Sequence, residues 1–315
     1  MYKSENSKIS IEEFDKLFET LKNWGRWGED DDKGTLNYIT PEKVKAAAAL
    51  VKSGRSVSMA IPINKNAGPD NPNPALHYMV NTHDINIGSG ELRFAMDFLG
   101  IQFHGDCHTH IDAFCHIAYK GLLYNGKPAT SVTVRGAEIY DITTYAPGIV
   151  GRGVLIDIPR YRGIKWLEPG VSVTREEIEA VEQAEGVRLQ EGDMMILRTG
   201  HHRRRLDLGA WDPGYTGQGR AGLDPYSLVL LYERKVSVFL PDGDGEVVPS
   251  NVEGIQYPIH PLQITAMGMV CADSLQLEDL AKVCEEEGRF EFMVVLAPSP
   301  LPGGTGSLIN PIAIF

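Results

Sequence analysis

The stretch HGDCHTHIDAFCH, residues 104–116, holds four of the nine histidines in the chain together with two aspartates. Six of its side chains are of the kinds that bind metal ions: His104, Asp106, His108, His110, Asp112 and His116. In an extended strand, side chains alternate between the two faces, so the five from His104 to Asp112 would point to the same side. We therefore expect a strand with one face of imidazoles and carboxylates.

Such a face is costly inside a protein, because each unpaired imidazole or carboxylate loses its hydration on burial. Binding a divalent cation removes this cost, and mutual hydrogen bonding in a polar cleft is the alternative. The mixture of nitrogen and oxygen ligands is typical of Zn2+, Mn2+ or Fe2+ and differs from a thiolate site. His116 lies four residues beyond Asp112, where we expect the chain to leave the strand, and this position suits a general acid or base.

The composition of the whole chain limits its partners. With 315 residues, the protein can bury a core that needs no disulfide or metal. The net charge of −12 disfavours nucleic acid, whose phosphates are bound by an excess of Lys and Arg. No apolar run approaches the roughly 20 residues that span a bilayer, and the first ten residues lack an apolar signal core. We therefore expect a cytoplasmic protein with no nucleic-acid or membrane partner.

Local signals predict both helices and buried strands. Helix start and stop signals cover about residues 10–23, 40–54 and 174–186, the first and third with the pattern of a capping box. Four apolar runs predict strands: GVLIDIP (153–159), DMMILRTG (193–200), VSVFLPD (236–242) and FEFMVVLAP (290–298). Unalternating runs of this kind suit strands buried on both faces, so the pattern indicates a layered α/β fold with parallel or mixed pairing. The four cysteines form no CxxC pair, and we expect free thiols.

The segment HTHIDAFCH (108–116) resembles the H-x-D-x-x-x-H end of the motif of the cyclase superfamily of metal-dependent hydrolases. That superfamily includes bacterial kynurenine formamidase, isatin hydrolase and a manganese-dependent dienelactone hydrolase. Further segments resemble its longer members: residues 26–63, 151–159, 192–200 and 303–315. The resemblance implies an α/β fold of the swivelling β/β/α type with a mixed sheet. We expect an N-terminal helical segment, 1–63, packed on a main domain, 64–315, in one compact unit.

The first metal ligand departs from the motif of the short family members, H-x-G-T-H-x-D-x-x-x-H. Aligned without gaps, the motif places Asp106 at the first histidine and His108 at the glycine, while His110, Asp112 and His116 match directly. We expect His108, His110 and Asp112 to hold the metal, because His108 supplies the imidazole that the motif requires. Asp106 and His104 are the alternatives for the first ligand.

A later segment, 259–281, offers two further candidates by resemblance. Family members with two metals, or with a fuller set of ligands, take a histidine and an acid from a helical stretch. His260 and Asp273 lie at suitable positions, with Asp in place of the more usual Glu. The resemblance thus implies that both side chains join the candidate metal site.

The resemblance implies a hydrolase that cleaves a carbon–nitrogen bond in a small amide or cyclic amide. A bound Mn2+ or Zn2+ would lower the pKa of water and polarise the substrate carbonyl, while His116 would carry the proton to the leaving nitrogen. Lactone hydrolysis and the reverse, ring-closing reaction are the alternatives within this chemistry. A non-catalytic metal- or ligand-binding protein is the alternative from another class. We further expect a homodimer or homotetramer.

Overall fold

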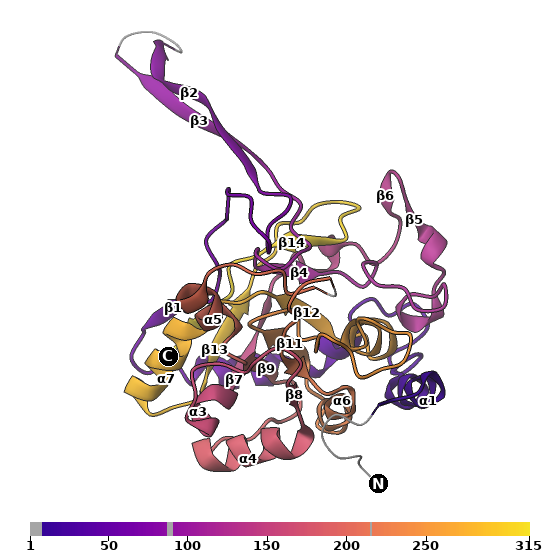
Figure 1. The fold of residues 1–315 in the computed structure, drawn as a ribbon. Helices are drawn as coiled ribbons and strands as arrows, with labels where there is room; N and C mark the ends of the chain where they lie inside the picture. Colours follow the sequence, from indigo (N-terminus) through magenta and orange to yellow (C-terminus); the bar gives the residue numbers. More distant parts are fainter. Residues whose placement is uncertain (1–7, 87–90, 215) are drawn as a thin grey trace.

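The computed structural model describes residues 8–86, 91–214 and 216–315. Most of the first ten residues, which were expected to lack a signal peptide, therefore lie outside the described residues. A mixed sheet of nine strands forms the centre of the described fold (Figure 1). In order across the sheet, the strands are β1 (Ser56–Ser58), β15 (Ile312–Ile314), β13 (Glu291–Leu296), β7 (Ile149–Asp157), β9 (Met194–Arg198), β11 (Val238–Pro241), β12 (Val270–Asp273), β4 (His110–Asp112) and β14 (Gly306–Leu308).

The four predicted apolar runs form the adjacent strands β13, β7, β9 and β11 of this sheet. Strands β7, β9, β11 and β12 pair in parallel, whereas β13 and the outer strands pair antiparallel. The side chains of β9 and β11 are buried throughout, as expected for strands that are covered on both faces. The prediction of an α/β fold with a mixed sheet is confirmed.

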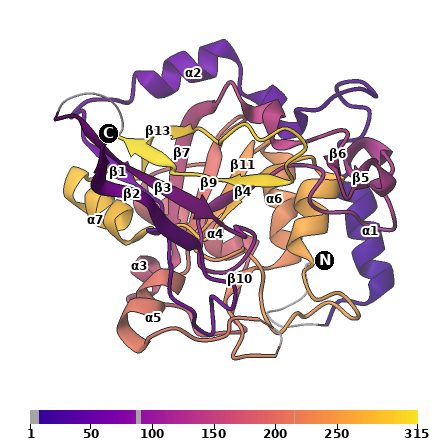
Figure 2. The ribbon, with the colours of Figure 1, turned by 90° about the horizontal axis from the view of Figure 1, so that it is seen from above.

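The helices cover both faces of the sheet (Figure 2). They are α1 (Ile11–Leu21), α2 (Pro41–Ala48), α3 (Ile158–Arg162), α4 (Arg175–Glu185), α5 (His201–Leu208), α6 (Leu228–Glu233) and α7 (Glu278–Glu287). Successive residues of β7 belong to separate apolar clusters, since Val154 shares one cluster with buried residues of α1, α4 and α6, whereas Leu155 shares the other with buried residues of α7. The sheet is therefore the middle layer between two cores. No helix of the described residues is long and apolar enough to cross a membrane.

The predicted helix starts are confirmed, and two details differ. Ser10 forms both hydrogen bonds of the predicted capping box. The second helix ends at Ala48, well before the glycine that we expected to end it. Thr174 caps α4, but the carboxylate of Glu177 binds Arg162 and does not complete a capping box.

Shorter elements complete the described fold. Three two-stranded sheets pair β2 (Leu76–Asn86) with β3 (Arg93–Gly100), β5 (Val132–Thr133) with β6 (Gly136–Ala137), and β8 (Ser172–Val173) with β10 (Gly222–Leu223). Single helical turns are η1 (Gly34–Tyr38), η2 (Tyr124–Gly126), η3 (Ala129–Ser131), η4 (Ile142–Tyr145), η5 (Pro225–Ser227) and the π-helical η6 (Pro261–Ala266). The β2–β3 hairpin extends away from the rest of the protein (Figure 1).

Candidate metal centre

Strand β4 contains only His110–Asp112, and residues 104–109 before it form an irregular turn. The expectation that five side chains share one strand face is therefore wrong, because side-chain alternation requires an extended backbone. Strand β4 lies between β12 and β14. Its antiparallel pairing with β12 places Asp273 opposite His110 and Cys271 opposite Asp112. Since directly opposed residues point to the same face, the sheet itself brings these four side chains together.

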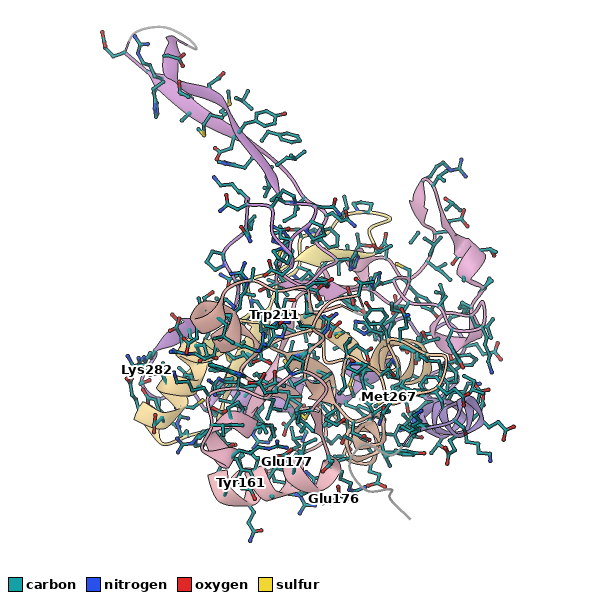
Figure 3. All side chains as sticks on the ribbon, in the orientation of Figure 1. Tyr161, Glu176, Glu177, Trp211, Met267 and Lys282 are labelled. Atoms are coloured by element: carbon teal, nitrogen blue, oxygen red, sulfur yellow. The ribbon has the colours of Figure 1, made fainter. Side chains whose placement is uncertain are left out.

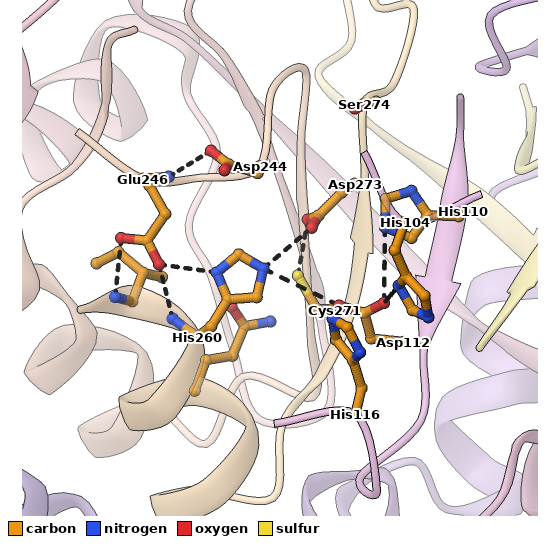
Figure 4. Close-up of polar contacts among 12 residues, drawn as sticks. His104, His110, Asp112, His116, Asp244, Glu246, His260, Cys271, Asp273 and Ser274 are labelled. Atoms are coloured by element: carbon orange, nitrogen blue, oxygen red, sulfur yellow. Dashed lines mark hydrogen bonds and ion pairs between the residues drawn. The ribbon is translucent and has the colours of Figure 1, made fainter. Parts of the chain in front are cut away.

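The carboxylate of Asp112 lies at the centre of this group (Figure 4). Asp112 is 2% exposed, and neither of its oxygens accepts a hydrogen bond within the described residues. Its Oδ1 lies 3.0 Å from His104 Nδ1 and 3.6 Å from His110 Nε2, and its Oδ2 lies 3.9 Å from His116 Nε2. A buried carboxylate without hydrogen-bond donors, faced by imidazole nitrogens, fits a divalent cation.

Hydrogen bonds orient two of these imidazoles. His110 Nδ1 lies 2.8 Å from the carbonyl oxygen of His108, which leaves Nε2 facing Asp112. His104 Nε2 lies 2.9 Å from Thr305 Oγ1, which leaves Nδ1 facing the same carboxylate. Ligand atoms of His104, His110 and Asp112 lie within 4.8 Å of one another. A protein usually fixes the ring of a metal-binding histidine by a hydrogen bond to the ring nitrogen that does not bind the metal.

His260 and Asp273, the two candidates from the later segment, lie beside Asp112. His260 Nε2 is 3.2 Å from Asp273 Oδ2 and 4.0 Å from Asp112 Oδ2. Its Nδ1 is 2.7 Å from Glu246 Oε1, and Glu246 also accepts a hydrogen bond from the backbone N–H of His260. Cys271 completes a second group of possible ligands with Asp112, His260 and Asp273.

The buried charges shift the pKa of several groups at this centre. Burial alone raises the pKa of Asp112, but His116 and His104 outweigh burial and hold that pKa well below its usual value. Burial lowers the pKa of His116 to about 4, although Asp112 opposes the change. Burial also disfavours protonation of His260, but its bonds to Asp273 and Glu246 raise its pKa above the usual value. His116 is therefore neutral at neutral pH, whereas Asp273 and Glu246 favour the protonated form of His260.

A cavity of about 510 Å3 opens onto these residues. His116 lines it, and the His116 ring stacks on that of His104, with centroids 3.8 Å apart. Asp106 also lines the cavity, but its carboxylate is paired with the buried guanidinium of Arg220. Arg220 Nη1 lies 2.7 Å from Asp244 Oδ2 as well. Burial raises the pKa of Asp244 to about 7, although Arg220 lowers it.

His108 lies apart from this group. It lines a separate cavity of about 450 Å3 between the 58–63 segment and the end of the chain. Both of its ring nitrogens are buried without a hydrogen-bond partner in the described residues, and burial lowers its pKa. Of the three candidates for the first ligand, the structure brings His104 to Asp112 and pairs Asp106 with Arg220.

Thr305 and Cys271 were not predicted from the sequence, whereas Glu246 belongs to the acidic turn 242–246, whose carboxylates were expected at the rim of the active site. Thr305 contacts a histidine 201 residues away in the chain, whereas Glu246 contacts one only 14 residues away. Cys271 was assigned as a free thiol, and all four cysteines are indeed free and buried. Its Sγ lies 2.8 Å from Asp273 Oδ1, and burial together with Asp273 raises the pKa of the thiol. Its position opposite Asp112 depends on strand pairing, which the sequence alone does not specify.

Comparisons with known proteins agree with this architecture. The Cyclase family model matches residues 32–243, about two thirds of the chain. The crystal structure of a novel cyclase is 32% identical, with a TM-score of 0.82, and the match covers 95% of this chain and 99% of that one. An isatin hydrolase bound to the product analogue thioisatinate is 18% identical, with a TM-score of 0.54, and the match covers 88% of this chain and 97% of that one. Isatin hydrolase A from Ralstonia solanacearum is 21% identical, with a TM-score of 0.57, and the match covers 87% of this chain and 97% of that one. The comparison with curated proteins gives no match.

Proposed function

The chain belongs to the cyclase family, and from that premise we propose that it is a metal-dependent hydrolase acting on the carbon–nitrogen bond of a small amide or cyclic amide. The observation that carries the proposal is the buried Asp112 carboxylate, which accepts no hydrogen bond from the described residues and faces three imidazoles beside a cavity. The choice of bond follows the isatin hydrolases that share the fold, since isatin is a cyclic amide.

His104, His110 and Asp112 are the residues that would hold a divalent cation, Mn2+ or Zn2+. This set replaces His108 by His104, because His104 directs a ring nitrogen at Asp112 whereas His108 lines another cavity. Asp273 and His260 are the candidates for further ligands or for a second cation. When bound, such a cation lowers the pKa of a water molecule and polarises a substrate carbonyl.

His116 is the candidate for proton transfer. Its ring lines the cavity, and its Nε2 lies 3.9 Å from Asp112 Oδ2, farther than the nitrogen of His104. Because burial lowers the pKa of His116 to about 4, the imidazole is neutral at neutral pH and can accept a proton from water. The same nitrogen can then return the proton to the leaving nitrogen of the substrate.

The remaining residues of the cavity wall shape the substrate site. Arg220 is held between Asp106 and Asp244, so its positive charge is already balanced by carboxylates. A substrate anion would therefore gain little from Arg220, which favours an uncharged amide, lactam or lactone. The same site could open a lactone or run the reaction towards ring closure, and these stay as alternatives to amide hydrolysis.

Metal analysis followed by a substrate screen tests the proposal. The purified protein should contain Mn or Zn by elemental analysis and should hydrolyse an N-formyl aryl amide or an isatin-like lactam faster than an unsaturated lactone. Asp112→Asn should lose both metal and activity, whereas Asp207→Asn, which removes a surface carboxylate on α5, should lose neither. A protein that binds metal but hydrolyses none of these compounds would support the non-catalytic alternative, and full metal occupancy in Asp112→Asn would place the metal elsewhere.

A further inference from the structure

Cys271 is a thiol at the candidate metal centre to which the proposed function gives no role. Side chains crowd the body of the protein around the central sheet, whereas they stand clear on the β2–β3 hairpin (Figure 3). Cys271 belongs to β12 in that sheet and is 0% exposed. Its sulfur is therefore shielded from solvent, and its chemistry depends on the groups that it contacts.

Strand pairing places Cys271 beside two carboxylates. Cys271 and Asp273 are two residues apart on β12 and share one face, and Asp112 of β4 lies opposite Cys271. The Sγ atom is 2.8 Å from Asp273 Oδ1 (Figure 4). Ligand atoms of Asp112, His260, Cys271 and Asp273 all lie within 4.8 Å of one another. No other cysteine belongs to such a group of possible ligands within the residues that the structure describes.

Hydrogen bonding within this group leaves Asp112 without a donor. The thiol of Cys271 and the Nε2 atom of His260 both contact Asp273, at 2.8 Å and 3.2 Å from its two oxygens. Both oxygens of Asp112 are buried, and neither accepts a hydrogen bond from the described part of the chain. Burial of a carboxylate without partners is costly, and a divalent cation between the four side chains removes this cost.

We propose that Cys271 binds a cation as a thiolate, in a second site formed with Asp112, His260 and Asp273. The inference rests on the proposed function, which already assigns a first cation to Asp112. The family motif and its later histidine and acid contain no cysteine, so the sulfur ligand is an addition to them. When the cation binds, a lone pair of the sulfur forms the bond and the thiol proton is released to solvent.

The two oxygens of Asp112 face different groups of ligands. Oδ1 lies 3.0 Å from His104 Nδ1 and 3.6 Å from His110 Nε2, whereas Oδ2 lies 4.0 Å from His260 Nε2. One carboxylate can therefore bind a cation on each side. His260 is oriented for the second cation, because its Nδ1 lies 2.7 Å from Glu246 Oε1 and its Nε2 faces the aspartates. A carboxylate behind the ring is a common support for a zinc-binding histidine.

The chemistry of the four side chains favours Zn2+ at the second site. One thiolate, one imidazole and two carboxylates provide four ligands, the usual number in a tetrahedral structural zinc site. Thiolates select soft cations such as Zn2+, whereas Mn2+ is best bound by oxygen ligands. Four protein ligands leave no position for water. The second site therefore fixes the Asp112 carboxylate, and hydrolysis takes place at the first site.

Cobalt substitution tests the sulfur ligand directly, because a bond between Co2+ and a thiolate gives a charge-transfer band in the near ultraviolet. Metal-free wild type titrated with Co2+ should develop this band, and Cys271→Ala should lose it. The matched control is Cys284→Ala, which removes an equally buried cysteine on α7 and should keep the band. Absence of the band in wild type at saturating Co2+ overturns the proposal even if Cys271→Ala folds poorly. An unchanged band in Cys271→Ala overturns it as well.

Calorimetric titration tests the preference for zinc. Wild type should bind two Zn2+ per chain but one Mn2+. Cys271→Ala should bind the second Zn2+ about 100-fold more weakly, at or beyond the effect of losing a group that only orients a ligand. Two Mn2+ bound to wild type with equal affinity would overturn the preference for zinc.

The first and second sites are separated by His104→Ala, which alters only the first. This variant should keep the cobalt band, and loss of the band would overturn the separate second site. A wild type that shows the band but hydrolyses no amide supports the Cys271 site, while the proposed function fails. A wild type that hydrolyses an amide but shows no band keeps the proposed function and overturns the Cys271 site.

Discussion

His104 and His108 are four residues apart in one turn, yet they line different cavities. His104 directs Nδ1 at the Asp112 carboxylate and is held by Thr305, whereas His108 is buried with both ring nitrogens unpartnered in the described residues. The same side chain is therefore a candidate ligand at one position and a buried polar group at the other. The comparison teaches that residue type and spacing do not identify the first ligand here. Residues 104–109 form a turn, so their side chains do not alternate between two faces as they would in a strand.

The largest expected effect concerns the cavity that His104 lines. His116→Ala should lower kcat by about 10²- to 10⁴-fold, the usual contribution of a positioned acid–base group, while metal content stays near that of wild type. Steady-state kinetics on the best substrate of the screen and elemental analysis measure the two quantities. Recovery of the rate with excess metal would show instead that His116 orients a ligand.

The comparison itself is tested by His104→Ala and His108→Ala. Loss of a ligand should weaken Mn2+ binding by more than ~100-fold in His104→Ala, beyond the 10- to 100-fold effect of losing a group that only orients a ligand. Binding should be unchanged in His108→Ala. Calorimetric titration of both folded variants measures this difference, and the reverse order would restore His108 as the first ligand.

A smaller effect is expected at Thr305, which orients His104. Thr305→Val removes the hydroxyl group that lies 2.9 Å from His104 Nε2 and should weaken Mn2+ binding by about tenfold, towards the lower end of such effects. Thr305→Ser retains the hydroxyl group and serves as the control. Similar affinity in both variants would mean that the turn holds His104 without this hydrogen bond.

The smallest expected effect is on the free energy of unfolding, which the buried His108 side chain should lower. His108→Leu removes a buried polar group that has no hydrogen-bond partner among the described residues and should raise the free energy of unfolding by about 1 kcal/mol at neutral pH. Burial lowers the pKa of His108 below its ordinary value of 6.5, so the unfolded chain binds a proton more readily than the folded protein. Wild-type stability should therefore decrease further as the pH falls below about 6.5. Urea unfolding at pH 7.5 and 5.5 should show a larger gain for His108→Leu at the lower pH, and an equal gain would argue against a depressed pKa.

The central sheet was predictable because its strands are specified by local composition. The runs that become β7, β9, β11 and β13 are apolar almost throughout. Strands β9 and β11 bury every residue, as strands covered on both faces do, whereas β13 buries every second residue. The β2–β3 hairpin was not predicted at all. Its strands contain exposed aromatic and aliphatic residues, and local patterns do not indicate whether such residues meet a core, solvent or another molecule.

The sequence by itself determined the chemical types of the candidate side chains and the ones that lie nearest in the chain: the proposed ligands His110 and Asp112, with His116 just beyond them. Only the tertiary structure decided which further side chains join them. The pairing of β4 with β12 brings Asp273 and Cys271 beside Asp112. The turn before β4 brings in His104 and directs His108 elsewhere, because turn geometry depends on contacts such as that with Thr305, some 200 residues away in the chain.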